Sequence, residues 1–411
     1  MTRIVHTADW HLGARLIDCD RHDEHRAFLD WLLDRLEELR PDLLIVAGDI
    51  FDGATPPQEA LTLYYRFLSR LGSGAKCQTL ILGGNHDSPA TLHAPREVLR
   101  ALDVRVIASP PDNPADGLLE FEHVVVGAMP FLRERDVRLA TPGQSADEVA
   151  AAIRQGVAER YRAMYTFARS KAADRLIIAT GHLTAVGSQS SPSERIIHIG
   201  NLGAVNTACF DGFAYTALGH IHRPQTIGGD DRVRYAGSPL PLSFAEVDLA
   251  KEIRVIEVEG NRLTQRAIRI PIFRRVLRLT APAAHLATEL ARHQATSGES
   301  LSPWVELTVS DGRSHPDLDR QVRDAAKELR LRVLKVLTPA LLSLGDSNSH
   351  STIPTAPSLG DMRPEEVFLE RLRREQIDPL SNEARDLVVT FAELLSKMNE
   401  TVPAEIAEST A

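Results

Sequence analysis

The feature that most constrains the fold is a repeated unit, in which a short apolar run is followed at once by glycine and a polar residue. Asp42–Ala47 (DLLIVA) ends in Gly-Asp, and Arg175–Thr180 (RLIIAT) ends in Gly-His. Continuous apolar runs of this length are typical of strands that are buried on both faces. Between them lie segments with apolar residues at helical spacing, such as Glu24–Leu39. Repeated β–α units predict an α/β layer fold with substantial parallel pairing over residues 1–270. The strands expected there are Thr2–Ala8, Asp42–Ala47, Gln78–Leu82, Arg175–Thr180 and Phe213–Leu218, and the helices are Glu24–Leu39, Gln58–Leu71 and Asp147–Ala173.

The pattern changes at about Arg275. The expected elements there are the strands Val276–Thr280, Trp304–Val309 and Leu331–Val336, with helices at Ala284–His293 and Pro316–Leu329. They predict a small α+β domain. Residues 341–361 are rich in Ser, Pro and Gly, which is typical of a flexible linker. Two amphipathic helices are expected beyond it, near Pro364 and after Pro379. The predicted units are 1–274, 275–340, a linker at 341–361 and a helical segment at 362–400.

Composition narrows the class of protein without naming a function. No apolar run approaches the roughly 20 residues of a membrane span, and the N-terminus lacks a signal-peptide pattern. Three widely spaced cysteines predict a reducing compartment, hence the cytoplasm. The net charge of −9 argues mildly against non-specific nucleic-acid binding, so any such role has to come from the motifs.

Five strand ends bear side chains that metal ions favour. They are Asp9-x-His11, Gly48-Asp49, Gly84-Asn85-His86-Asp87, Gly181-His182 and Gly219-His220-Ile221-His222. Sites in open α/β sheets form at the carboxyl edges of strands, so the five clusters are expected to converge. Glycine before four of them lets the chain turn sharply.

The residue types indicate which ions would bind. Carboxylate, imidazole and amide ligands suit borderline divalent metals such as Mn²⁺ or Fe²⁺. Seven candidate ligands are too many for one ion and suit two ions with a shared carboxylate. Paired ions of this kind stabilise the attacking and leaving oxygens of a phosphoester. The candidates are Asp9, His11, Asp49, Asn85, His182, His220 and His222.

Each cluster alone has an ordinary explanation. Asp-x-His is common in turns and caps, GNHD fits a tight turn, and GHxH fits two hydrogen-bonded histidines. All five in this order, each at a strand end, indicate a metallophosphoesterase. The remaining histidines are expected to be ordinary surface or core residues, with His6 inside the first strand.

The motifs DWHLG, GDIFDG, GNHDS, ATGHLT, LGHIHRPQ and YAGSPLPLSF together resemble those of the calcineurin-like metallophosphoesterases. Within that superfamily they are similar to the SbcD nucleases, counterparts of the archaeal and eukaryotic break-repair nuclease. The resemblance implies a fold of two central sheets flanked by helices, a small capping domain that helps hold DNA, and a C-terminal helical pair. GNHD is the nuclease form of a motif that is usually GNHE in the phosphatases.

The resemblance also implies a role for each site residue. Asp9, His11 and His222 would bind the first metal, and Asn85, His182 and His220 the second, with Asp49 bridging. His86 would be the catalytic histidine that protonates the leaving oxygen, and Asp87 would orient it.

The activity implied is that of a Mn²⁺-dependent DNA nuclease. It would trim duplex ends from the 3′ side and cut single strands and hairpins, in repair, recombination and replication. The tail helices would bind the coiled coil of an SbcC-like ATPase, in an assembly with two copies of each subunit. The alternatives are a phosphatase or cyclic-nucleotide phosphodiesterase on the same site, and a metal-binding scaffold for the ATPase. For the capping unit the alternative is a stability module, and for the tail it is packing on the chain's own core.

Overall fold

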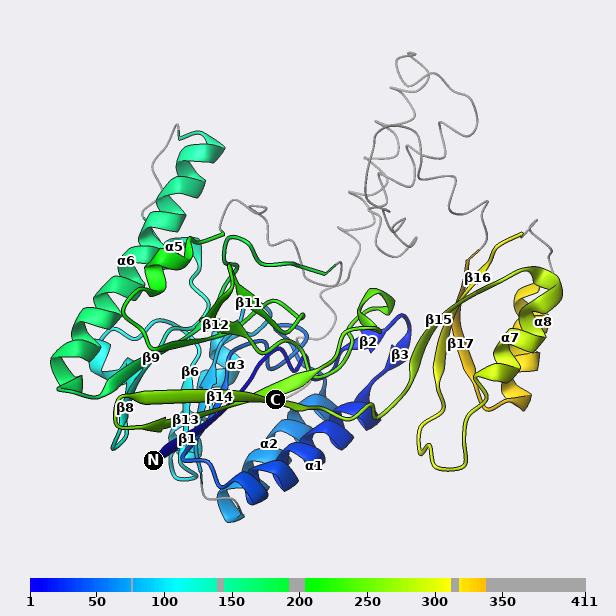
Figure 1. Ribbon diagram of the computed structural model, residues 1–411, viewed down its shortest axis with the longest axis horizontal. Helices are drawn as coiled ribbons and strands as arrows, with labels where there is room; N and C mark the ends of the chain where they lie inside the picture. The colour runs from blue at the N-terminus through cyan, green and yellow to red at the C-terminus, as the bar shows by residue number, and fades with distance from the viewer. Residues whose placement is uncertain (75–76, 139–143, 192–203, 312–317, 338–411) are drawn as a thin grey trace, which may run out of the picture. The chain divides into compact units, whose positions relative to one another are not determined.

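The structure is a computed structural model of the chain, and it describes residues 1–74, 77–138, 144–191, 204–311 and 318–337 (Figure 1). The predicted linker at 341–361 and the predicted helices near Pro364 and Pro379 lie outside the described residues.

Six strands form the first sheet, in the order β14-β13-β1-β4-β5-β6. Their bounds are β1 Thr2–Thr7, β4 Leu43–Val46, β5 Gln78–Leu82, β6 Val104–Ile107, β13 Glu252–Glu259 and β14 Arg262–Arg269. The strands β1, β4, β5 and β6 run parallel. Strand β13 joins β1 antiparallel, and β14 pairs antiparallel with β13. The predicted parallel pairing is confirmed, with an antiparallel extension at one side.

The second sheet also has six strands, in the order β11-β12-β10-β9-β8-β7. Their bounds are β7 Leu118–Glu120, β8 Val124–Ala128, β9 Leu176–His182, β10 Tyr215–Gly219, β11 Gln225–Ile227 and β12 Asp230–Tyr235. The strands β8, β9, β10 and β12 are parallel, and β7 and β11 close the two sides antiparallel. The carboxyl ends of β9 and β10 are in register, with Gly219 opposite His182.

The alternation of side chains along β4 explains the layers. Leu44 and Val46 pack into a core with the helices α1 (His22–Leu39) and α2 (Gln58–Ser73). Leu43 and Ile45 pack into a core that they share with the second sheet. Successive strand residues point to opposite faces, so a run such as DLLIVA needs a partner layer on each side. The two sheets therefore face each other, with helices outside them.

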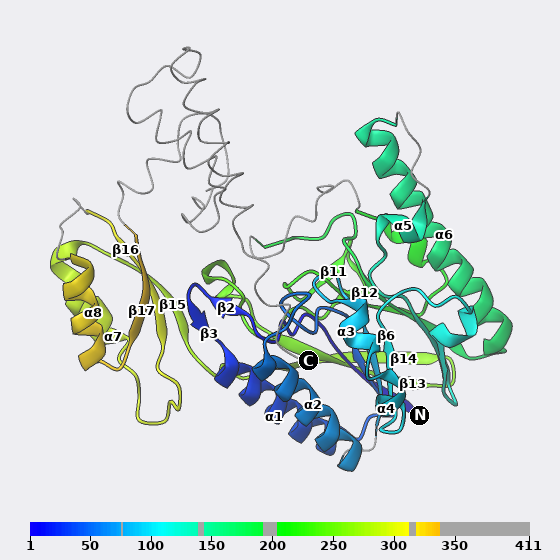
Figure 2. The ribbon, with the colours of Figure 1, turned by 180° about the vertical axis from the view of Figure 1, so that it is seen from behind.

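Helices cover the outer faces of both sheets. Helices α1 and α2 lie side by side on the first sheet, and α6 packs on the second through Val157, Tyr161 and Ala168 (Figures 1 and 2). The α-helices up to residue 172 are α1 His22–Leu39, α2 Gln58–Ser73, α3 Pro89–His93, α4 Arg96–Arg100, α5 Glu134–Val137 and α6 Ala146–Ala172. The short 3₁₀ helices are η1 Pro114–Gly117, η3 Thr207–Phe210 and η4 Phe244–Glu246. The three helices predicted for this region are confirmed.

A three-stranded parallel sheet follows, in the order β15-β16-β17. Its strands are β15 Val276–Ala281, β16 Trp304–Val309 and β17 Arg332–Leu337, and its helices are η5 Ala283–His285, α7 Leu286–Arg292 and α8 Leu318–Glu328. These are the elements predicted for the small α+β unit, and they enclose a core of their own. A further cluster joins Val276 and Trp304 to Leu16, Cys19 and Phe244, where Leu16 and Cys19 belong to the hairpin β2 Arg15–Leu16 and β3 Cys19–Asp20.

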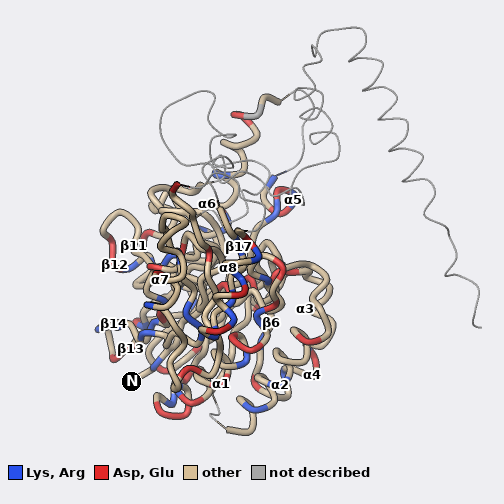
Figure 3. Tube along the Cα trace, turned by 90° about the vertical axis from the view of Figure 1, so that its right-hand side faces the viewer, with Lys and Arg blue, Asp and Glu red and all other residues tan. Residues whose placement is uncertain are grey.

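Among the described helices, none combines the length and apolar character needed to cross a membrane. Figure 3 shows basic and acidic residues interspersed along the described chain.

Candidate metal centre

The five predicted clusters follow the carboxyl ends of neighbouring strands. The first sheet supplies the clusters after β1, β4 and β5, and the second sheet supplies those at the ends of β9 and β10. The strands within each sheet are adjacent and parallel, so their polar ends meet at one edge of the sandwich. The predicted residues are buried there, except Asn85, which is half-buried. The predicted convergence is therefore what the structure has.

Asp49 lies at the middle of the cluster. Its Oδ2 is 3.3 Å from Nε2 of His182 and 3.6 Å from Nε2 of His11. Its other oxygen accepts a hydrogen bond from the backbone N–H of His86, at 2.9 Å. One carboxylate oxygen thus faces a histidine from each sheet, which is the position that a ligand shared by two ions would occupy.

Two sets of ligand atoms surround Asp49. On one side His182 Nε2 and His220 Nδ1 lie 2.8 and 2.9 Å from Oδ1 of Asn85. On the other side Asp9, His11 and Asp49 each place a ligand atom within 4.8 Å of the others. The ring of His222 lies edge-on to that of His11, with 5.0 Å between the ring centroids.

Two buried atoms show that the residues fit a cation. Within the described residues, Oδ2 of Asp9 and Nε2 of His11 are buried without a hydrogen-bond partner. A buried polar atom that makes no bond is costly, and a divalent ion would satisfy both at once. The mixed oxygen and nitrogen donors suit a borderline divalent metal.

The protonation of the cluster follows from burial and from the opposed charges. Burial raises the pKa of Asp9 to about 7, against the lowering effect of His182. Burial, together with the charge of the neighbouring His182, lowers the pKa of His220 to about 3. Burial alone would also lower the pKa of His182, but the charge of Asp49 raises it to about 9. His220 is therefore neutral in the metal-free cluster, whereas His182 is charged and would lose its proton on binding a metal.

Two carboxylates support His222 and His11, and the sequence did not indicate either. Nδ1 of His222 lies 3.4 Å from Oε1 of Glu246, whose other oxygen is 2.8 Å from the buried ammonium of Lys251. Nδ1 of His11 lies 3.2 Å from Oδ1 of Asp52. A carboxylate can only accept, so each Nδ1 donates and the lone pair of each ring lies on Nε2. Burial alone would raise the pKa of Glu246, but the hydrogen bond to His222 and the charge of Lys251 hold it well below its usual range.

The predicted catalytic residues, His86 and Asp87, are connected through backbone groups of the loops that bear them. The ring of His86 donates from Nδ1 to the backbone carbonyl of Asp52, at 2.8 Å. The carboxylate of Asp87 accepts from the backbone N–H groups of Ile50, Phe51 and Gly84, at 2.9–3.1 Å. Asp87 thus ties the loop after β4 to the loop after β5. We propose that Asp87 orients His86, as predicted, through these backbone contacts.

Several of the predicted ligands have unusual backbone dihedral angles. Asp9, His11, Asp49 and His220 all have φ between 45° and 100°, the left-handed region that side chains other than glycine rarely adopt. Strain of this kind persists where the surrounding structure holds it, and it is concentrated at functional sites. Gly48 has φ of +90°, and a Cβ there would overlap the ring of His182. The glycine of this cluster is thus needed for space as well as for the turn.

Gly48→Ala should displace the ring of His182 and break its 2.8 Å hydrogen bond to the carbonyl of Ala47. We expect the affinity for a divalent cation to fall at least about 10-fold, and the free energy of unfolding to fall by about 1–3 kcal/mol. Calorimetric titration and thermal melting measure the two effects. Gly53→Ala is the matched control from the same GDIFDG motif, because a Cβ there meets nothing within 4 Å. Identical behaviour of the two variants would contradict the packing argument.

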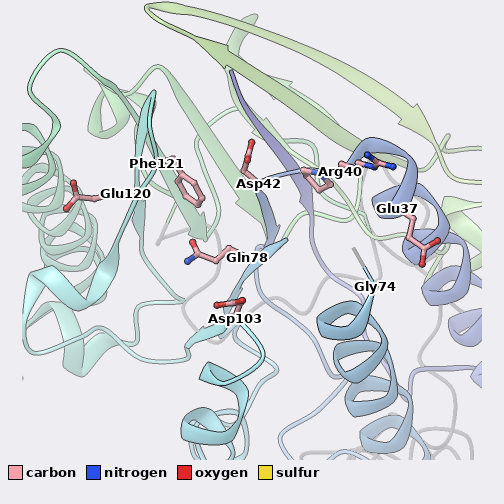
Figure 4. Close-up of a pocket in the computed structure, with 9 residues that line it drawn as sticks. Glu37, Arg40, Asp42, Gly74, Gln78, Asp103, Glu120 and Phe121 are labelled. Atoms are coloured by element: carbon pink, nitrogen blue, oxygen red, sulfur yellow. The ribbon is translucent and has the colours of Figure 1, made fainter. Parts of the chain in front are cut away.

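A large open hollow, of about 910 Å³, lies elsewhere on the part of the chain that forms the two six-stranded sheets. Figure 4 shows its lining side chains, among them Asp42, Gln78 and Asp103. These residues stand at the amino ends of β4, β5 and β6, the opposite ends from those that bear the ligands. The hollow is therefore separate from the metal centre.

Two family models match the chain. The calcineurin-like phosphoesterase model matches residues 2–224, and the model described as the Type 5 capsule protein repressor C-terminal domain matches residues 272–376.

Relatives of similar length match most of the chain. The SbcD subunit of the nuclease SbcCD from Escherichia coli (strain K12) is 35% identical over 384 residues, which cover 92% of this chain and 94% of that protein. The protein of the same name from Rhodobacter capsulatus is 38% identical, covering 80% of this chain and 86% of its own. That from Bacillus subtilis (strain 168) is 33% identical, covering 75% and 78%.

Proposed function

The chain belongs to the SbcD family of calcineurin-like phosphoesterases and is a metal-dependent nuclease, and from that premise we propose that it cleaves DNA with two Mn²⁺ ions. The observation that supports two ions best is Asp49, whose Oδ2 lies between a histidine of each sheet, at 3.3 and 3.6 Å. The nuclease names of the relatives favour this function over a phosphatase, a cyclic-nucleotide phosphodiesterase or a scaffold.

We assign the ligands by the side of Asp49 on which they lie. Asp9, His11 and His222 would hold the first ion, and Asn85, His182 and His220 the second, with Asp49 shared. Two ions bound there would supply charge stabilisation to the attacking and leaving oxygens of a phosphodiester. The choice of Mn²⁺ is supported by the mixed carboxylate, imidazole and amide donors.

His86 is the proposed proton donor to the leaving oxygen. Its ring lies edge-on to that of His11, with 4.8 Å between the ring centroids, so it is next to a proposed ligand of the first ion. Nδ1 donates to the carbonyl of Asp52, so Nε2 is the nitrogen from which a proton would pass to the substrate. Histidine is the side chain that most often serves as a general acid in such a step.

The substrates and partner are proposals that rest on the family. We propose 3′–5′ exonuclease action on duplex ends and endonuclease action on single strands and hairpins. An SbcC-type ATPase with a coiled coil would be the partner, in a complex with two copies of each subunit. The relatives are named as one subunit of a nuclease called SbcCD, and that name supports such a partner.

We keep the predicted domain division as a proposal: nuclease 1–274, DNA-holding cap 275–340, linker 341–361 and partner-binding segment 362–400. The separate core of the small sheet and the family-model match to residues 272–376 support the boundary near 275. We also propose a cytoplasmic location, supported by three widely spaced cysteines that are all free.

The test is cleavage of an end-labelled DNA hairpin by the purified chain, with Mn²⁺, with Mg²⁺ and with a chelator. We expect cutting with Mn²⁺, none with the chelator, and loss of cutting in Asp49→Asn, which removes the charge of the shared ligand. If the chain alone does not cut, the assay is repeated with an SbcC-type partner and ATP. Hydrolysis of the monoester p-nitrophenyl phosphate without DNA cleavage even then would contradict the nuclease and favour a phosphatase.

A further inference from the structure

A sixth strand end reaches the edge of the sandwich that bears the predicted ligands. Strand β8 pairs parallel with β9, whose last residue is His182. The segment after β8, residues 129–133, contains Phe131 and Arg133. Parallel strands bring their carboxyl ends to one edge of a sheet. Both side chains therefore belong to the surroundings of the metal centre, although the sequence did not indicate either.

Two hydrogen bonds join this segment to the loop after β5. The backbone N–H of Phe131 donates to the carbonyl of Gly83, at 2.9 Å. The guanidinium Nη2 of Arg133 donates to the carbonyl of Asp87, at 3.3 Å. Gly83 and Asp87 enclose the stretch of the loop that contains His86. The guanidinium of Arg133 is thus held next to the residue that follows the proposed proton donor.

Phe131 connects Arg133 to the other side of the metal centre. The ring of Phe131 lies edge-on to the ring of His182, with 6.2 Å between the ring centroids. The central carbon of the Arg133 guanidinium lies over the same phenyl ring, 5.9 Å from its centroid. A cation over an aromatic face is attracted to it. Arg133 is therefore one side chain away from a proposed ligand of the second ion.

Arg133 differs from the other arginines of its segment in having no carboxylate partner. Arg135 pairs with Asp136. Arg138 pairs with Glu134. The carboxylate of Asp136 also accepts from the backbone N–H of Arg133, at 2.8 Å, which fixes the start of α5. Within the described residues, the guanidinium of Arg133 forms no ion pair, and its hydrogen bond is to the neutral carbonyl of Asp87.

The chemistry of a guanidinium indicates what Arg133 could bind. It has five N–H donors in a planar fork, which matches two oxygens of a phosphate. A residue that only held the carbonyl of Asp87 would need a donor and no charge. A half-buried cation without a carboxylate, beside a centre proposed to hold two divalent ions, instead suits an anion that comes with the substrate.

We propose that Arg133 binds a backbone phosphate of the DNA strand next to the scissile one, so that the strand is held across the metal centre. The ligand is a phosphodiester anion that only a nucleic acid supplies, since a small phosphoester has no second phosphate. This inference rests on the proposed function. It makes Arg133 a substrate-binding residue that acts on DNA and leaves the cleavage chemistry unchanged.

The first measurement is binding of a fluorescent DNA hairpin, by anisotropy, to the whole protein at several salt concentrations with a chelator present. Arg133→Gln keeps an amide donor for the carbonyl of Asp87 and loses the charge. Its affinity should fall about 10- to 100-fold, and the slope of log affinity against log salt should fall by about 1. Arg133→Lys should keep the slope and bind less tightly than wild type, because it keeps the charge without the fork. Arg135→Ala, which removes an exposed arginine, is the control and should bind as wild type does.

The second measurement separates a neighbouring phosphate from the scissile one. With Mn²⁺, Arg133→Gln should hydrolyse bis-p-nitrophenyl phosphate at the wild-type rate, because this diester has no second phosphate. Hairpins with one neutral methylphosphonate, on either side of the cleaved bond, are then compared with the unmodified hairpin. At one of these two positions the neutral linkage should weaken binding to the wild type and should weaken binding to Arg133→Gln no further.

The outcomes distinguish this inference from the proposed function. Equal hairpin affinity of wild type and Arg133→Gln would overturn the role of Arg133, as would an equal loss of bis-p-nitrophenyl phosphate hydrolysis. A methylphosphonate effect that is the same in both proteins would also overturn it. Each of these results leaves the nuclease standing if the wild type cuts the hairpin. A wild type that neither binds nor cuts DNA with its SbcC-type partner would overturn the function itself. If Arg133→Gln does not fold, as circular dichroism would reveal, Arg133→Lys and the neutral linkages decide.

Discussion

His86→Ala should lower the rate of hairpin cleavage by about 10²- to 10⁴-fold, the usual contribution of a positioned acid or base. Binding of two Mn²⁺ should be retained, because the ring of His86 is held through Nδ1 by the carbonyl of Asp52 and is not among the proposed ligands. Single-turnover cleavage of the labelled hairpin measures the first effect, and calorimetry the second. The combination of lost rate and kept metal is what identifies a proton donor.

His123→Ala is the control for removing a histidine, because that side chain is 22% exposed and pairs with a glutamate at the surface. It should cleave at the wild-type rate. A His86→Ala enzyme that cut as fast as this control would end the assignment of His86 as the acid. Loss of one Mn²⁺ together with the rate would instead make His86 a ligand.

Glu246→Ala should destabilise the protein by about 3–5 kcal/mol, since it removes one partner of a buried ion pair. Glu246 is fully buried, and it lies 2.8 Å from Nζ of Lys251, which is 7% exposed. The ammonium keeps the carbonyl of His222 and the hydroxyl of Ser238 as partners, but its charge is no longer balanced. Urea unfolding of the metal-free protein measures this effect without any contribution from ion binding.

Two comparisons make the test specific. The exposed pair of Arg70 and Asp30 has side chains about half exposed, so Asp30→Ala should cost less than about 1 kcal/mol. The double variant Glu246→Leu with Lys251→Met should recover much of the stability lost in Glu246→Ala, because neither charge is then left unpaired. A loss below about 1 kcal/mol for Glu246→Ala would show that water reaches Lys251 and that the pair is not closed.

Much of the site could be predicted because its residues lie at strand ends. An apolar run that ends in glycine marks both the strand and the point where the chain emerges at the edge of the sheet, as at Val46 and Asp49. The order of the sheets could not be obtained in this way. Strand β1 pairs with β13, with Thr2 opposite Val258, and nothing in the local sequence of either strand specifies a partner so distant. The two facing sheets were an implication of the family resemblance.

The carboxylates that support the predicted ligands were also missed, because local sequence does not show which distant residues come together. Glu246 and Lys251 follow the YAGSPLPLSF motif, and by sequence alone they are an ordinary charged pair in a polar segment. Only the fold places them behind His222. Strand β14 was also missed, because its alternating polar residues belong to a largely exposed strand and lack the apolar run of the buried ones. His6 was expected inside the first strand, and it is fully buried there, against Tyr215 of the second sheet.

The pairing of the first strand with one about 250 residues away has a consequence for how the protein folds during its synthesis. As the chain leaves the ribosome, Asp9 and His11 emerge before the other ligands, and His222 and its support Glu246 follow more than 200 residues later. The partner strand of β1, β13, begins at Glu252 and is therefore made after both of these residues. A nascent chain therefore has an incomplete set of proposed ligands until His222 has been added, and one edge of β1 stays unpaired until β13 has been made. The metal centre is therefore assembled only after its last ligand has been made, from segments that are synthesised far apart in time.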